Sequence, residues 1–127
     1  MKYLLDTNTA IWALGEQDKL SKSAKAIIDD VSISLCVSII SAWEIAIKVN
    51  IGKLDFDGGS ARFLDEMQHN GIEILSINGF HVETVEKLPR IHGDPFDHML
   101  IATAKTDNLT ILTPDKDIQQ YDVSWAW

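Results

Sequence analysis

Four acidic side chains stand where strands and helices are expected to meet, and carboxylates grouped in such places can do chemistry on phosphates. They are Asp6, Glu44, Asp97 and Asp115. Several carboxylates at one place repel one another unless a cation binds between them. Oxygen donors without cysteine and with few histidines suit Mg²⁺, with Mn²⁺ as the alternative. The chemistry that such a site does best is phosphodiester hydrolysis by metal-activated water.

Short apolar runs alternate with segments of helical spacing, and these are the elements that must position the acids. Strands are predicted at residues 3–5, 31–40, 72–75 and 109–113, with an edge strand at 122–127. Helices are predicted at residues 9–14, 21–30, 41–51, 61–69, 82–88 and 95–104, with a short one within 114–120. This alternation predicts an α/β fold with a mainly parallel sheet covered on both faces. The length predicts one domain over residues 1–127.

The predicted strands place three of the four acids together. In parallel sheets the ligand site forms at the carboxyl ends of the strands, near the point where the strand order reverses. Asp6 and Asp115 directly follow strands and Glu44 follows one after a short connection, so these three should share one rim. Asp97 joins them only if its helix begins at that rim, and its position before a strand leaves this open.

Each acid also has a purely structural interpretation. Asp6 fits a helix N-cap, and Ser41 with Glu44 fits a capping box. Asp97 in a first helical turn favours the positive end of the helix dipole, and Asp115 fits the start of a turn. Taken singly, each of these interpretations is the commoner use of such a residue. Their convergence on one rim is what favours a site.

Neighbouring residues compete with the four acids or adjoin them. Asp94 fits the cap before Pro95 better than it fits a metal ligand. Lys48, one helical turn after Glu44, fits either an ion pair with Glu44 or a phosphate contact. Asp117 competes with Asp115 as Asp94 does with Asp97, and His92 and His98 flank the site without a third partner that would suggest a histidine-based metal site. Trp43 is expected to pack in the core rather than to join an interface.

Composition restricts the function classes. The net charge of −8 opposes binding to nucleic acid unless the acids cluster and hold cations, which would then present positive charge to a phosphate. The single cysteine, Cys36, excludes a disulfide framework and a cysteine-rich zinc site. No run approaches the about 20 apolar residues that a membrane-spanning helix needs, so a cytoplasmic protein without membrane contact is expected.

Four stretches of the chain, in order, resemble PIN domains and, within them, the VapC-type ribonuclease toxins. The stretches are LLDTN at 4–8 with WAL at 12–14, SIISAWEIAIK at 38–48, GDPFDHMLIA at 93–102 and LTPD at 112–115. The resemblance implies a PIN-like three-layer α/β/α fold in which the helix carrying Asp97 begins at the shared acidic pocket. It also implies that Asp6, Glu44, Asp97 and Asp115 bind magnesium. The supporting polar residues that orient carboxylates and water would be Thr7, Asn8, Ser41 and Thr113.

The same resemblance implies a function and partners. VapC-like proteins are homodimers that cut transfer or ribosomal RNA, and a cognate VapB-like antitoxin silences them through a basic tail that enters the acidic groove. A catalytically silent PIN-like module that only binds a partner is the main alternative. A receiver-type signalling domain and a phosphatase with Asp6 as nucleophile each need a further acid after the first strand, where Thr7 and Asn8 stand. The sequence does not separate RNA from DNA as substrate.

Overall fold

The computed structural model describes residues 1–127 and has a sheet of five parallel strands at its centre. The strands are β1 (Lys2–Leu5), β2 (Ser34–Ser38), β3 (Glu73–Leu75), β4 (Thr110–Leu112) and β5 (Trp125–Ala126). Their order in the sheet is β3-β2-β1-β4-β5. From β1 the chain adds β2 and then β3 on one side of the sheet, and later adds β4 and β5 on the other side of β1. The point where the strand order reverses lies between β1 and β4.

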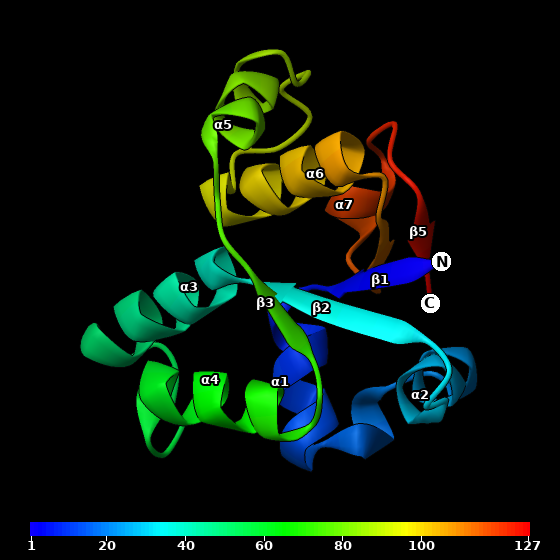
Figure 1. Ribbon diagram of the computed structural model, residues 1–127. Coiled ribbons are helices and arrows are strands. Elements are labelled where there is room, and N and C mark those ends of the chain that lie inside the picture. Colours follow the sequence, from blue (N-terminus) through cyan, green and yellow to red (C-terminus); the bar gives the residue numbers. More distant parts are fainter.

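Helices cover both faces of the sheet, which confirms the predicted α/β fold (Figure 1). One face carries α1 (Thr7–Gly15), α2 (Lys22–Asp29), α3 (Ile39–Asn50) and α4 (Gly59–His69). The other carries α6 (Pro95–Asp107) and α7 (Lys116–Gln119), with α5 (Gly79–Glu86) packed against α6. A short 3-10 turn at Gln17–Lys19 connects α1 to α2. No helix has the length and apolar character required to span a bilayer.

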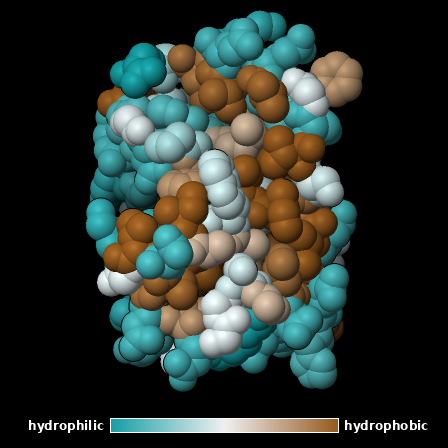
Figure 2. All heavy atoms as spheres, turned by 90° about the vertical axis from the view of Figure 1, so that its left-hand side faces the viewer, coloured by the Kyte–Doolittle hydropathy of each residue, from teal (hydrophilic) through white to brown (hydrophobic).

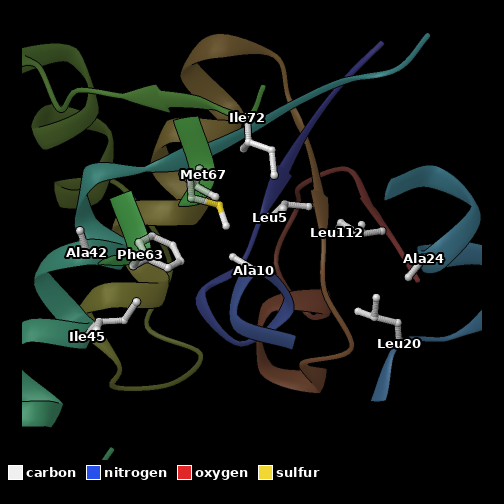
Figure 3. Close-up of a cluster of buried hydrophobic side chains, with 11 residues drawn as sticks. Leu5, Ala10, Leu20, Ala24, Ala42, Ile45, Phe63, Met67, Ile72 and Leu112 are labelled. Atoms are coloured by element: carbon white, nitrogen blue, oxygen red, sulfur yellow. The ribbon is translucent and has the colours of Figure 1, made fainter. Parts of the chain in front are cut away.

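Side chains of the strands alternate between two separate hydrophobic cores, one on each face of the sheet. In β1, Leu4 packs towards α6 and α7, whereas Leu5 packs towards α1 to α4. Successive side chains of a strand point to opposite faces, so nearly continuous apolar strands fill both layers. Figure 3 shows the larger core, where Phe63 and Met67 of α4 lie near Ala42 of α3. The buried strands are thereby fixed between two helical layers.

The junction between β2 and α3 differs from the sequence prediction. The strand ends at Ser38 and the helix begins at Ile39, without a loop, whereas a strand to residue 40 and a helix from 41 were expected. The hydroxyl of Ser38 accepts a hydrogen bond from the amide of Ile40 at 3.0 Å and caps the helix. The capping-box interpretation of Ser41 and Glu44 is therefore wrong, and Glu44 lies in the second turn.

The other helix starts follow local capping. Ser21 caps α2 by accepting from the amide of Ala24, and Asp94 caps α6 ahead of Pro95, both as predicted. Helix α5 begins at Gly79, three residues before the predicted start. Asn78 accepts from the amide of His81, whose ring nitrogen accepts from the Asn78 amide in return. This capping box uses a histidine where glutamate or glutamine is usual, which explains why the sequence pattern missed it.

Replacing Ser38 by alanine is expected to lower the free energy of unfolding by about 1–2 kcal/mol, because the partly buried amide of Ile40 loses its only side-chain acceptor. Urea denaturation followed by circular dichroism measures the loss. Ser124→Ala, at an exposed position, is the matched control and should change stability by less than about 0.5 kcal/mol. Equal losses in the two variants would contradict the role of the Ser38 cap.

Candidate functional site

Asp6 lies at the point where the strand order reverses. It follows β1 directly, and the last residue of β1 is paired in register with Leu112, the last residue of β4. Asp6 caps α1, with one carboxylate oxygen accepting from the amide of Thr9 at 2.7 Å. The other oxygen accepts from the hydroxyl of Thr113, which follows β4. The capping role and the site role therefore fall on the same side chain.

The environment of Asp6 disfavours a lone negative charge. The side chain is buried, and burial raises its pKa above the ordinary value. The hydrogen bonds from Thr113 and Thr9 act in the opposite direction, and the charge of Asp115 raises the pKa further. A buried carboxylate whose ionisation is opposed in this way is stabilised by any nearby cation.

Asp115 is joined to Asp6 through a single hydroxyl. The amide of Asp115 donates to the Thr113 hydroxyl at 3.0 Å, and that hydroxyl in turn donates to Asp6. The carboxylate of Asp115 caps α7 by accepting from the amide of Asp117 at 2.9 Å. Asp117, its competitor in the sequence, is itself exposed. Thr113 thus aligns the acids that follow the two strands on either side of the reversal.

Asp97 stands at the third position of α6. The sequence left open whether this helix begins at the rim that the other acids share. Burial raises the pKa of Asp97 to about 7, a hydrogen bond from His92 lowers it, and the charges of Asp94 and Asp115 raise it. The charge of Asp115 therefore acts on both Asp6 and Asp97. The start of α6 faces the same rim as the carboxyl ends of β1 and β4.

Glu44 belongs to a neighbouring hydrogen-bonded group. It is buried, and its Oε1 accepts from the hydroxyl of Thr7 at 2.7 Å. That hydroxyl also lies 2.8 Å from the hydroxyl of Ser41. The second oxygen of Glu44 forms an ion pair with Lys48, as one of the two interpretations of that lysine predicted. Thr7 follows Asp6 in the chain and so connects the two parts of the rim.

The remaining residues of the prediction show what the sequence could and could not supply. Asn8 is exposed, and its side chain makes no hydrogen bond. His92 donates to or accepts from Asp97 at 2.9 Å, and its ring also contacts Tyr121. The only sequence signal for His92 is its place five residues before Asp97. Tyr121 has no local signal, because its contact depends on how α7 returns towards α6.

The aromatic side chain of Trp43 corrects another expectation. It is 57% exposed rather than packed in the core, and its ring meets the edge of Phe96 at a centroid distance of 5.4 Å. The earlier start of α3 explains this, since it turns Trp43 to solvent while Ala42 and Glu44 on either side are buried. Figure 2 views the side towards which β2 points, where apolar side chains gather on both sides of a paler strip.

The donor set fits a hard divalent cation better than any other metal. The acids at the rim offer carboxylate oxygens, without a cysteine and with one adjoining histidine that is committed to a carboxylate. In their present rotamers, no three histidine, cysteine, aspartate or glutamate side chains meet closely enough to hold an ion. The fit therefore rests on chemistry and charge: the negative charge of Asp115 raises the pKa of both Asp6 and Asp97.

A parallel α/β domain with acids gathered where the strand order reverses defines a class of protein, and comparison with known proteins identifies its family. The sequence model of the PIN domain matches residues 3–124. The chain belongs to the PIN-domain family, which confirms the resemblance seen in the sequence.

Individual relatives agree with this assignment. Ribonuclease VapC16 of Mycobacterium tuberculosis is 39% identical over 72 residues, which make up 56% of this chain and 48% of that protein. The match thus spans about half the length of this curated relative. The structure of VapBC2 from Rickettsia felis bound to a DNA fragment from its promoter superposes with a TM-score of 0.73 at 16% identity, covering 99% of this chain and 98% of that chain. VapBC-1 from nontypeable Haemophilus influenzae gives a TM-score of 0.70 at 21% identity over 99% and 97%. At these identities the structural likeness establishes the fold.

Proposed function

We propose that the protein is a magnesium-dependent endoribonuclease and the toxin component of a type II toxin–antitoxin pair. The observation that carries the proposal is the placement of the buried carboxyl group of Asp6 and the partly buried one of Asp97, both with raised pKa, around the charge of Asp115 at the strand-order reversal. Such an excess of buried negative charge is relieved by a divalent cation. The similarity to a ribonuclease, VapC16, supports RNA as the substrate class.

The residues of the rim have distinct tasks in this proposal. Asp6, Asp97 and Asp115 hold the cation, with Glu44 as the fourth acid of the rim. A bound Mg²⁺ or Mn²⁺ supplies an activated water and neutralises charge on the scissile phosphate. Thr113 holds Asp6 in place and orders Asp115 through its backbone amide. Thr7 and Lys48 hold the carboxylate of Glu44 in place, one through a hydrogen bond and the other through an ion pair. Lys48 also limits the negative charge that an incoming phosphate meets.

The charge of the chain supports an antitoxin with a basic segment as partner. A hollow of about 310 Å³ lies beside the end of α1 and the connection between α3 and α4. Its walls combine apolar and acidic residues with one arginine: Ile11, Leu14, Gly15, Glu16, Leu54, Asp55, Phe56, Asp57 and Arg62. Together with the net charge of −8, this lining favours an apolar peptide that carries lysine or arginine. A VapB-like antitoxin is the partner of that chemistry that we propose.

The exposed apolar side chains support a homodimer. Ile39, Trp43 and Val49 of α3 are each more than a third exposed, which is unusual for large apolar residues gathered on one helix. The apolar areas in Figure 2 extend over this side of the molecule. A second copy that covers them would place two acidic sites on one assembly. We further propose that the assembly acts in the cytoplasm, on transfer or ribosomal RNA.

A second candidate, a catalytically silent module that only binds a partner, is favoured by two observations. No three acids meet closely enough to hold an ion, and Glu44 is committed to Lys48. The two candidates differ in a measurable property, because only the nuclease needs to bind a divalent cation. Calorimetric titration of the purified protein with Mn²⁺ separates the two candidates before any substrate is chosen, because only the nuclease is expected to bind the ion.

Purified protein is expected to cut a circular RNA in Mg²⁺ and to lose this activity entirely in EDTA, because cleavage depends on the bound cation. A circular substrate has no ends, so linear products identify an endonuclease. Activity should return when excess Mg²⁺ or Mn²⁺ is added back. Gel electrophoresis reads the products, and a circular DNA of the same sequence tests the choice of RNA. Cleavage that persists in EDTA would reject the mechanism, and binding of Mn²⁺ without any cleavage would favour the silent module.

A further inference from the structure

His92 is held at three points by its neighbours, and none of these contacts is part of the acidic rim itself. Its backbone amide donates to the hydroxyl oxygen of Tyr121 at 3.2 Å, and its ring Nδ1 lies 2.8 Å from the same oxygen. Its backbone carbonyl lies 2.7 Å from the ring Nε2 of His98. The three rings also pack edge to face, with centroids 5.1–6.2 Å apart. Only one polar atom of His92 remains, Nε2, and it lies 2.9 Å from Oδ2 of Asp97.

The pattern of donors and acceptors selects one tautomer of His92. The Tyr121 oxygen already accepts from the His92 amide, and its own hydrogen needs an acceptor in this buried place. The available acceptor is Nδ1, which must then be without a proton. A neutral imidazole carries its proton on the other nitrogen, so Nε2 donates to Asp97. Any form with a proton on Nδ1 leaves the Tyr121 hydrogen without an acceptor, at the penalty of an unmade buried hydrogen bond.

We propose that Tyr121 and His92 are positioning residues for Asp97: Tyr121 fixes the tautomer of His92, and His92 fastens one carboxylate oxygen of Asp97 so that the other is presented to a divalent cation. Only Oδ2 of Asp97 takes part in a hydrogen bond, and Oδ1 has none. The side chains of His92 and Asp97 are 12% and 15% exposed, so little water competes for this contact. The positioning role rests on the proposed metal-dependent function, whereas the tautomer does not.

The tautomer is tested in the wild-type protein without any substitution. Two-dimensional NMR that correlates the ring nitrogens of ¹⁵N-labelled histidine with the ring protons distinguishes a protonated Nε2 from a protonated Nδ1. Spectra recorded at about pH 8, where histidine is normally neutral, should show His92 with the proton on Nε2. The signals are assigned by their loss in the His92→Gln protein. A protonated Nδ1, or an average of the two tautomers, would overturn the proposal.

The positioning role is tested by Mn²⁺ affinity, measured by calorimetry in three variants. Tyr121→Phe and His92→Phe keep an aromatic ring in the cluster but remove the hydroxyl or the donor, and each should weaken Mn²⁺ binding by about 10- to 100-fold. His92→Gln keeps an N–H near the position of Nε2 and should recover most of the affinity. Tyr3→Phe is the matched control, since Tyr3 lies in β1 and its hydroxyl makes no hydrogen bond. Thermal unfolding verifies that all four proteins are folded.

The outcomes separate this inference from the proposed function. Wild-type affinity in Tyr121→Phe and His92→Phe would overturn the positioning role and leave the metal site intact. Equal weakening in His92→Gln and His92→Phe would also overturn it, since a donor at Nε2 would then have no effect. Absence of Mn²⁺ binding by the wild type would overturn the metal site and the orientation of Asp97 towards it. In that case the NMR result would still decide the hydrogen bonding of His92.

Discussion

Replacing Asp6 by asparagine is expected to abolish RNA cleavage, with a loss of roughly a thousandfold or more, while the protein stays folded. The loss follows because the substitution removes a negative charge from the place where the cation is held. A bound metal ion lowers the activation free energy of hydrolysis by several kcal/mol. The fold should be kept because asparagine is as good a helix N-cap as aspartate. Its carbonyl oxygen can accept from the amide of Thr9, and its amide can donate to the Thr113 hydroxyl.

Cleavage rates and a cell-based assay measure this effect independently. The matched control is Asp65→Asn, the same chemical change at an exposed position of α4, and it should cleave RNA at the wild-type rate. Expression of the wild-type protein in bacteria should slow growth, whereas expression of Asp6→Asn should not. Equal growth inhibition by the two proteins would count against the toxin assignment. A cleavage rate within a few-fold of the wild type would remove Asp6 from the site.

The parts of the site that follow strands were accessible from the sequence. Asp6 and Asp115 directly follow short apolar runs, and in a parallel sheet the carboxyl ends of neighbouring strands meet at one edge. The structure adds the hydroxyl of Thr113 as the physical link between them. Local pattern was sufficient here because the sheet itself converts a position along the chain into a position in space.

The parts of the site that depend on helix packing were not accessible in this way. Nothing local determines where α6 begins in space, and its placement at the rim depends on the packing of Leu100 and Ile101 against the sheet. The resemblance to PIN domains supplied that placement before the structure did. The contact between His92 and Tyr121 is of the same kind, because it joins residues 29 positions apart through the return of the chain after α7.

The boundary between β2 and α3 shows a different limit. Ile39 and Ile40 are β-branched and apolar, so periodicity assigns them to the strand as readily as to a helix. The hydroxyl of Ser38 decides the matter by capping the helix two residues earlier than expected. The shift rotates every side chain of the first turns, which is why Trp43 faces solvent instead of the core.

Replacing Asp97 by asparagine is expected to stabilise the metal-free protein at about pH 8, by on the order of 3 kcal/mol after allowance for the solvent that reaches this side chain. Burial raises the pKa of Asp97 from 3.8 to about 7. Between these two values the folded protein keeps a proton that the unfolded chain has lost. Stability therefore falls as the pH rises through this window, and the loss is complete above the folded pKa. Asparagine has no charge to bury and should not show this loss.

The same substitution should reverse its effect when a cation is added, because the cation stabilises the negative charge whose burial, with the neighbouring charges of Asp94 and Asp115, destabilises the metal-free protein. Urea denaturation in EDTA should show a gain for Asp97→Asn that vanishes at about pH 4 and grows towards pH 8, whereas Asp65→Asn should follow the wild type throughout. Mg²⁺ at about 100 times its Kd should stabilise the wild type by about 2.7 kcal/mol and the variant much less. A variant with the pH dependence of the wild type would show that Asp97 is not the buried acid responsible. An unchanged response to Mg²⁺ would show instead that the cation binds without Asp97.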